Sequence, residues 1–454
     1  MDTHTLDALQ RYWHMGPDMQ TTRQQIEDLW DKAFQDVQSL QTPLGVKASG
    51  QSGRFHAVFG RDSLWTVLFA LEASHELQRK QADNKLSARL PLPYGDWLHE
   101  LAETVLLGLA SLQGTTVNDV NEEQPGRIIH EYWEPVPAHM LASRWPVVNG
   151  RYYGSLDATP LFIATVKQVD DAFHDTALLD KLWPHVQAAL QWMLDWSDLD
   201  QDGRVEYLRR NPDGLGLDNQ VWKDSSEAVQ VEVSDPPIQH PLAWIEVQGY
   251  AWAAYAAYIA LAKQRNDLTP ALEQELQRRM QRLIEGQEAF WLADQRYPAM
   301  LLDAKKQPLK VVSSNPGHLL WSGCVSEAQA RQICSRLMQP DILTPWGLRT
   351  LSEQAYYYNP LAYHCGTVWP FDNAVCVLGL QRYGFTQEAQ LVVRAVLEAV
   401  YAFGEPVELY TVQPSHWVRS PRIEQEWFMA NYFYASSVQA WTAAAILYFA
   451  AFLL

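Results

Sequence analysis

The sequence predicts an all-α protein, and three features of the chain lead to this fold class. Segments with helical spacing recur along the whole length, strand-like alternation of apolar and polar residues is scarce, and no Pro-, Gly- or Ser-rich linker divides the 454 residues. We therefore expect one domain, residues 21–454, in which about a dozen helices stack as hairpins into a two-layered toroid. Residues 1–20 are expected to form a loosely attached N-terminal arm.

Capping patterns locate several helix starts. A Ser or Thr followed three residues later by Gln has capping-box spacing, and Thr before Pro is typical of an N-cap and a first helical residue. These patterns occur at Thr22 with Gln25, Ser326 with Gln329, and Thr269 with Pro270. They predict three separate helices.

Three apolar segments indicate how helices are buried. One face of a helix is marked by Leu182, Val186, Leu190 and Met193, with Pro184 either in the first turn or at a kink. Residues 243–262 are apolar nearly all round, which predicts a helix of an inner ring. Residues 440–454 are equally apolar but shorter than the roughly 20 residues that a membrane span needs. We expect a buried last helix there.

Composition and charge limit the classes of ligand that the protein is expected to bind. A net charge of −18 disfavours nucleic acid and anionic membranes, whereas 19 Trp and 20 Tyr suit the flat faces of sugars. The N-terminus has neither a basic nor an apolar segment typical of a secretion signal, so we expect a cytoplasmic protein. The four cysteines lack paired spacing and are expected to be free thiols: Cys324, Cys334, Cys365 and Cys376.

Four acidic residues lie in aromatic or glycine-rich segments rather than on polar helix faces, namely Asp62, Asp157, Asp224 and Glu408. Each also has a structural interpretation: Asp62 and Asp157 suit helix caps, and Glu408 suits the surface. Asp224 follows Trp222, which would desolvate it and favour the protonated form, but also Lys223, which would favour the carboxylate. The sequence leaves its pKa open.

The sequence contains no complete motif for a metal or a common cofactor. The segment 197–207 places Asp198, Asp200, Asp202 and Gly203 as in a calcium loop, but Arg209 holds the twelfth position, where a ligand is required. We interpret it as an Asp/Gly turn. No zinc-protease, nucleophile-elbow, phosphate-loop or dinucleotide pattern occurs, so we expect neither metal nor cofactor.

Ten segments in order along the chain resemble the bacterial amylo-α-1,6-glucosidase family, which is related to the C-terminal glucosidase domain of glycogen debranching enzyme. The segments are FGRDSLW (59–65), GRIIHE (126–131), YYGSLDATPLF (152–162), DQDGRVEY (200–207), NQVWKDS (219–225), EVQGY (246–250), SNPGHLLWSG (314–323), PWGLRTLS (345–352), YNPLAYHCGTVWPFDNA (358–374) and VELY (407–410). The resemblance implies an (α/α)6 toroid of the six-hairpin glycosidase type and an inverting mechanism without a cofactor.

The resemblance also implies roles for individual residues. Asp224 corresponds to the general acid and Glu408 to the general base, with Glu405, Glu424 and Glu426 as rival bases. The substrate-binding residues that it implies are Arg61, Asp62, Arg127, His130, Glu131, Asp157, Trp222, Lys223, Gln248, His318, Trp321, Trp346, Tyr363, His364 and Trp369. Inversion needs room for one water, so the two carboxyl groups should lie roughly 6.5–9.5 Å apart.

Departures from the family pattern weaken the substrate assignment. Val221 and Val407 replace a usual glycine and proline, and Ser436, Ser437 and Val438 precede Gln439-Ala440-Trp441 where Cys and Pro are usual. We also expect no β-rich N-terminal domain, which debranching enzymes usually carry. The main hypothesis is an inverting, debranching-type α-glucosidase that acts on an oligosaccharide.

Two alternatives remain beside this main hypothesis. One is a hydrolase of a small glycoside such as glucosylglycerate or mannosylglycerate, with Arg127 or Arg349 binding the glycerate carboxylate. The other is a silent glycan-binding protein that keeps the pocket. The sequence does not indicate the oligomeric state.

Overall fold

The computed structural model describes residues 22–82, 94–232, 236–414 and 427–454. The predicted N-terminal arm and the rival bases Glu424 and Glu426 lie outside these residues. The described chain is mostly helical, in agreement with the predicted class. Among its helices, none is long and apolar enough to cross a membrane.

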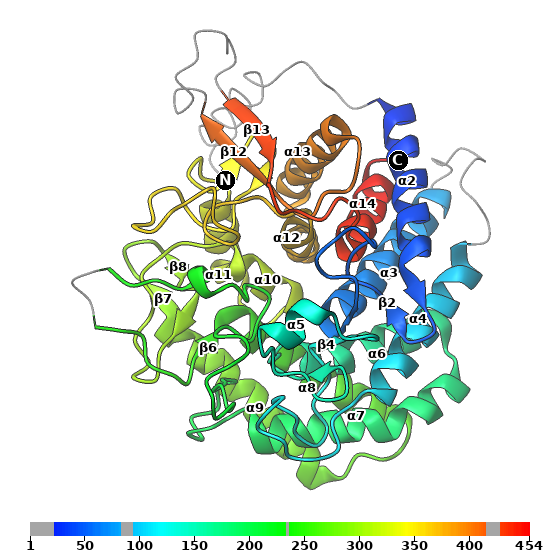
Figure 1. The fold of residues 1–454 in the computed structure, drawn as a ribbon, viewed down its shortest axis with the longest axis vertical. Coiled ribbons are helices and arrows are strands. Elements are labelled where there is room, and N and C mark those ends of the chain that lie inside the picture. Colours follow the sequence, from blue (N-terminus) through cyan, green and yellow to red (C-terminus); the bar gives the residue numbers. More distant parts are fainter. Residues whose placement is uncertain (1–21, 83–93, 233–235, 415–426) are drawn as a thin grey trace.

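Six helices lie around the centre of the molecule (Figure 1). They are α3 (Gly60–Ala82), α6 (Ala158–Phe173), α8 (Ile245–Gln264), α10 (Asn315–Ser322), α12 (Pro370–Arg382) and α14 (Ala440–Leu453). Each packs against the next in this order, and α14 packs against α3. Most of their residues are buried, including nearly all of α14, as the apolar C-terminal run predicts.

A second set of helices packs outside the first. They are α2 (Arg23–Leu40), α4 (Tyr94–Ser111), α7 (Thr176–Trp196), α9 (Pro270–Gly286), α11 (Glu327–Leu337) and α13 (Thr386–Phe403). These helices contact α14, α3, α6, α8, α10 and α12, respectively. Their buried residues form one face each, because only that face meets an inner helix. The other helical elements of the described residues are the short α5 (Ala138–Ala142) and two 3₁₀ turns, Ser226–Ala228 and Gln287–Phe290.

The strands are short and lie in the connections. The pairs are β1 (Gln41–Thr42) with β2 (Gly45–Val46), β6 (Ala243–Trp244) with β9 (Leu301–Leu302), β7 (Trp291–Leu292) with β8 (Tyr297–Pro298), β10 (Leu343–Thr344) with β11 (Gly347–Leu348), and β12 (Tyr410–Pro414) with β13 (Trp427–Asn431). A three-stranded sheet joins β3 (Val58–Phe59), β4 (Glu131–Tyr132) and β5 (Arg151–Tyr152). This sheet brings the start of α3 beside the segment before α6.

The predicted helix starts are confirmed. Thr22 and Ser326 form complete capping boxes with Gln25 and Gln329, and Thr269 caps α9, which begins at Pro270. Pro184 lies inside α7, which excludes the first-turn position, one of the two options considered for it. The start of another helix differs from the prediction. The apolar helix predicted from residue 243 begins at Ile245, because Ala243 and Trp244 pair with β9.

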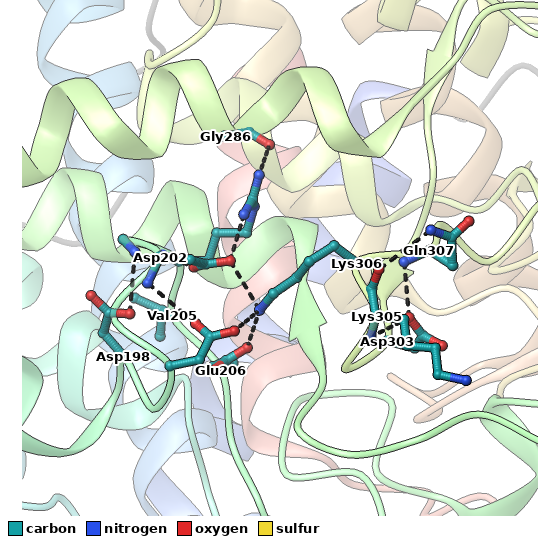
Figure 2. A network of polar contacts seen from close by, with 12 residues as sticks. Asp198, Asp202, Val205, Glu206, Gly286, Asp303, Lys305, Lys306 and Gln307 are labelled. Carbon is teal, nitrogen blue, oxygen red and sulfur yellow. Dashed lines mark hydrogen bonds and ion pairs between the residues drawn. The ribbon is translucent and has the colours of Figure 1, made fainter.

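The calcium-like segment is an Asp-rich turn, as predicted, and a lysine lies at its centre (Figure 2). Asp198 and Asp200 accept hydrogen bonds from the backbone N–H groups of the turn. The ammonium group of Lys306 lies 2.7 Å from Asp200, 2.9 Å from Asp202 and 2.8 Å from Glu206. Lys306 therefore supplies the positive charge that a calcium ion supplies in an EF-hand loop.

Replacing Lys306 by methionine should destabilise the protein. The side chain of Glu206 is 0% exposed, and burial already raises its pKa. Without Lys306 this carboxyl group either stays charged without a partner or takes up a proton, at a cost of about 3 kcal/mol in the free energy of unfolding. Thermal denaturation followed by circular dichroism measures the loss. Lys305→Met, at the exposed neighbouring lysine, is the matched control and should leave the melting temperature unchanged. Equal melting temperatures of both variants and the wild type would show that the ion pairs contribute nothing.

Candidate active site

The two carboxylates predicted to carry the chemistry lie in one pocket of about 320 Å³. Asp224 is on the connection between α7 and α8, and Glu408 is on the segment between α13 and β12. The pocket is lined by Phe55, Phe59, Arg61, Asp62, Trp222, Asp224, Tyr363, His364, Trp369, Glu408, Gln439 and Trp441. Segments from both halves of the chain thus meet at one cavity.

Arg61 ties the polar wall of the pocket together. Its guanidinium donates hydrogen bonds to Asp157 at 3.1 and 3.3 Å and to Asp224 at 3.1 Å, and the residue is only 3% exposed. Arg61 is in the first turn of α3, and Asp157 is the residue before α6. Asp157 makes no capping hydrogen bond through its side chain, because its carboxylate faces Arg61 and the hydroxyl of Ser155 instead.

Burial moves the carboxyl groups of the pocket toward neutral pKa values. It raises the pKa of Asp224 to about 6, an increase that the neighbouring Arg61 opposes. Burial also raises the pKa of Glu408 to about 7 and that of Asp62 to about 7, and repulsion from Asp224 adds to both. These carboxyl groups can therefore exchange protons near neutral pH, which acid–base chemistry requires.

Glu408 is oriented by two donors. The hydroxyl of Tyr363 donates to Oε1, and the backbone N–H of Ser436 donates to Oε2 at 2.9 Å. Both hydrogen bonds favour the carboxylate form and so oppose the rise in pKa that burial causes. Glu408 is 1% exposed, so its position is fixed by these contacts rather than by solvent. Glu405, the rival base among the described residues, does not line the pocket.

Aromatic rings form the rest of the pocket wall. Trp369 stacks on His364 with ring centres 5.0 Å apart and meets Tyr363 edge-on at 4.8 Å. Nδ1 of His364 is hydrogen-bonded to Ser225, and burial holds the pKa of this imidazole well below its usual value, so the ring is neutral. Flat apolar faces next to carboxylates match the CH and OH groups of a sugar ring.

Five of the residues singled out from the sequence lie behind this wall. Asp157 holds Arg61, and Lys223 points away from the pocket to the carbonyl of Thr350 at 2.6 Å. His318 stacks beneath Trp222, and both its ring nitrogens are hydrogen-bonded, to Tyr250 and Asp372. His130 packs edge-on against Phe59, and Glu131 accepts hydrogen bonds from the indoles of Trp133 and Trp145.

Four others hold the scaffold elsewhere. Arg127 is 3% exposed and donates to Gln220 and to two backbone carbonyls. Gln248 pairs with the backbone N–H and carbonyl of Val205. Trp346 belongs to a small apolar cluster beside β12. Trp321 lines a second cavity, formed by the C-terminal parts of α3, α6, α10 and α12, away from the pocket.

Four pocket residues escaped the sequence analysis: Phe55, Phe59, Gln439 and Trp441. Phe59 stands in the quoted segment FGRDSLW, and Gln439 and Trp441 stand in the tail segment noted for its departures. The position of Gln439 directly before α14 could have identified it as a pocket residue, because Arg61, Asp62 and Trp369 also lie where inner helices begin. Oε1 of Gln439 is buried without a hydrogen-bond partner and is free to accept one from a ligand.

Comparison with known proteins decides the family. The model of the mannosylglycerate hydrolase MGH1-like glycoside hydrolase domain matches residues 113–415. The chain belongs to the MGH1-like glycoside hydrolase family. It is therefore a glycosidase, in agreement with the enzyme class predicted from the sequence. No curated protein sequence matches it.

Solved structures show the fold that this MGH1-like chain shares. A GH63 mannosylglycerate hydrolase from Thermus thermophilus in complex with glucose is 16% identical, with a TM-score of 0.63, 92% of this chain covered and 99% of that chain. The same enzyme in complex with Tris and D-glycerate gives 15% identity, a TM-score of 0.61 and the same coverage. A rhamnosidase from Klebsiella oxytoca with rhamnose bound is 14% identical, with a TM-score of 0.56 and coverages of 96% and 66%.

Catalysis by this MGH1-like enzyme should depend on pH in a bell-shaped manner. One carboxyl group must be protonated and another ionised, so activity falls at low pH as the base is protonated and at high pH as the acid loses its proton. With pKa values of about 6 for Asp224 and about 7 for Glu408, kcat/KM should be highest between these values. Initial rates from pH 4 to 9 provide the measurement. A flat profile across this range would exclude the two carboxyl groups as the titrating pair.

Proposed function

We propose that this glycosidase is an inverting hydrolase of a small glycoside with an acidic aglycone, such as glucosylglycerate or mannosylglycerate. Asp224 acts as the general acid and Glu408 as the general base. The observation that carries the proposal is that these two carboxyl groups share one pocket with Arg61, Asp62 and stacked rings. In such a pocket one carboxyl can protonate the leaving oxygen while the other activates a water on the opposite face.

The family favours a small substrate. The family description concerns mannosylglycerate hydrolases, and one solved relative contains D-glycerate. These comparisons support the small-glycoside alternative from the sequence analysis better than the debranching-type α-glucosidase. The glycone, glucose or mannose, is open to test.

We also propose that the chain forms a single catalytic domain with an (α/α)6 toroid. The six inner helices contact one another in succession from α3 to α14, α14 contacts α3, and each has one outer partner. Three of the inner helices, α3, α12 and α14, have pocket residues at their N-terminal ends or directly before them, so the connections at this end of the toroid would form the active site. Cytoplasmic location stays a prediction from the sequence.

The roles of acid and base can be separated by the leaving group. A fluoride leaving group departs without a proton. Asp224→Asn should therefore lower kcat/KM roughly 100-fold or more on a glycerate glycoside, but far less on the matching glycosyl fluoride. Glu408→Gln should lose activity on both, because the attacking water still needs a base. Glu405→Gln is the control and should behave like the wild type. If Glu408→Gln instead kept its activity on the fluoride while Asp224→Asn lost activity on both substrates, Glu408 would be the acid and Asp224 the base.

The stereochemical outcome tests inversion. Proton NMR during the first minutes of turnover of an α-glycoside should show the β-anomer of the free sugar before mutarotation mixes the two forms. An initial α-anomer would mean retention, and would require one carboxylate to act as a nucleophile instead of a base. A screen of glucosylglycerate, mannosylglycerate, isomaltose, panose and maltose identifies the substrate for this measurement.

A further inference from the structure

Two connecting segments form the rim beside the pocket. The loop 48–57 contributes Phe55 to the pocket wall, and it is held against the segment before α14 by the Gly50 N–H to Val438 carbonyl bond of 3.0 Å. Within the loop, Phe55 N–H donates to the hydroxyl of Ser49 at 3.0 Å. These two hydrogen bonds hold the loop backbone in place at Gly50 and Phe55.

A series of ring contacts runs from the proposed base to this rim. Tyr363, which donates to Glu408, lies 5.6 Å from the ring of Tyr432, and Phe433 and Tyr434 follow with centre separations of 4.7 and 4.2 Å. Phe433 and Tyr434 are 68% and 57% exposed. Exposed rings of this size next to an active site are typical of a surface that a ligand covers.

Arg54 lies at the end of this series. Its guanidinium carbon is 5.3 Å from the ring centre of Tyr434 and 5.8 Å from that of Phe55. No ion pair of Arg54 exists among the described residues, and the side chain is exposed. Burial raises the pKa of Tyr363 well above its usual value, and the charge of Arg54 opposes this rise, so its field reaches the pocket wall.

The two arginines considered from the sequence for a glycerate carboxylate are engaged elsewhere. Arg127 is buried among protein oxygens, as described above. Arg349 is 0% exposed, pairs with Glu353 at 3.0 Å and donates to the backbone carbonyl of Val412 at 3.2 Å. Arg61, which lines the pocket, is hydrogen-bonded to Asp157 and Asp224. The cation for an acidic aglycone therefore has to come from an exposed residue next to the pocket lining.

We propose that Arg54, held between the rings of Phe55 and Tyr434, binds the carboxylate of the aglycone and so determines the preference of the enzyme for acidic glycosides. This inference rests on the proposed function and adds the residue that recognises the charge. The planar guanidinium can bind a carboxylate through two parallel hydrogen bonds, and stacking on rings limits its freedom before the ligand arrives. Phe55 lines the pocket and directly follows Arg54, so an aglycone that extends past Phe55 would come within reach of this guanidinium.

The experiment compares two substrates that differ in one group. Glucosylglycerate and glucosylglycerol, or the mannosyl pair, have the same glycosidic bond, but the carboxylate of the first is a hydroxymethyl group in the second. The measured quantity is the ratio of their kcat/KM values. Arg54→Gln should lower this ratio roughly 10- to 100-fold, as expected for the loss of a charge-assisted hydrogen bond. Arg54→Lys should lower it less, since the charge remains.

A matched control and the wild type distinguish the possible failures. Arg331→Gln, at an exposed arginine of the outer helix α11, should leave the ratio unchanged. In the wild type, rising salt should also lower the ratio, because the arginine is exposed to solvent. An unchanged ratio in Arg54→Gln overturns the inference and leaves the proposed function intact. A wild type that cleaves other glycosides but neither member of either pair overturns both.

Discussion

The active site depends on one buried guanidinium. Arg61 joins the first turn of α3, the residue before α6 and the Asp224 segment through hydrogen bonds to two carboxylates. A buried cation is tolerated when its charge and its donors are matched, so the two aspartates and the arginine stabilise one another's position. Asp224 is thereby placed by a residue 163 positions earlier in the chain. The geometry of the proposed acid follows from helix packing rather than from its own loop.

The direction of the inner helices explains why the charges gather at one end. Asp62, Glu246 and Asp372 lie in the first turns of α3, α8 and α12, and Asp157 lies directly before α6. Helix N-termini carry partial positive charge and favour carboxylates. The second cavity, by contrast, is formed by the C-terminal parts of inner helices and contains arginine and histidine beside its acids. One end of the molecule is thus suited to hold several acids close together.

The sequence predicted the helix starts well, because caps and periodicity depend on neighbouring residues. The quoted motifs also singled out Asp224 and Glu408, which share one pocket, while their catalytic roles stay a prediction. The sequence could not tell which motif residues face the cavity. Arg127 and Gln248 belong to the same kind of segment as Arg61, yet they hold the loops around Glu122 and Val205. Holding a loop and lining the pocket both need a buried polar side chain, and only the packed structure shows which of the two a given residue does. Phe55 and Trp441 reach the pocket from the two ends of the chain through the contact of α14 with α3.

The charges in the pocket affect which carboxyl group can act as the acid and which as the base. In the described part of the site one guanidinium, that of Arg61, interacts with the carboxyl groups of Asp62, Asp157 and Asp224, and Glu408 lines the same pocket as Asp62 and Asp224. Burial raises the pKa values of Asp62, Asp224 and Glu408, and repulsion from Asp224 adds to the rise at Asp62 and Glu408, so these three groups hold protons near neutral pH. Because Arg61 favours the charged form of Asp224, pKa values alone do not select it as the acid. In the proposed mechanism the bound sugar makes this selection, because its leaving oxygen would lie next to Asp224 and the attacking water next to Glu408.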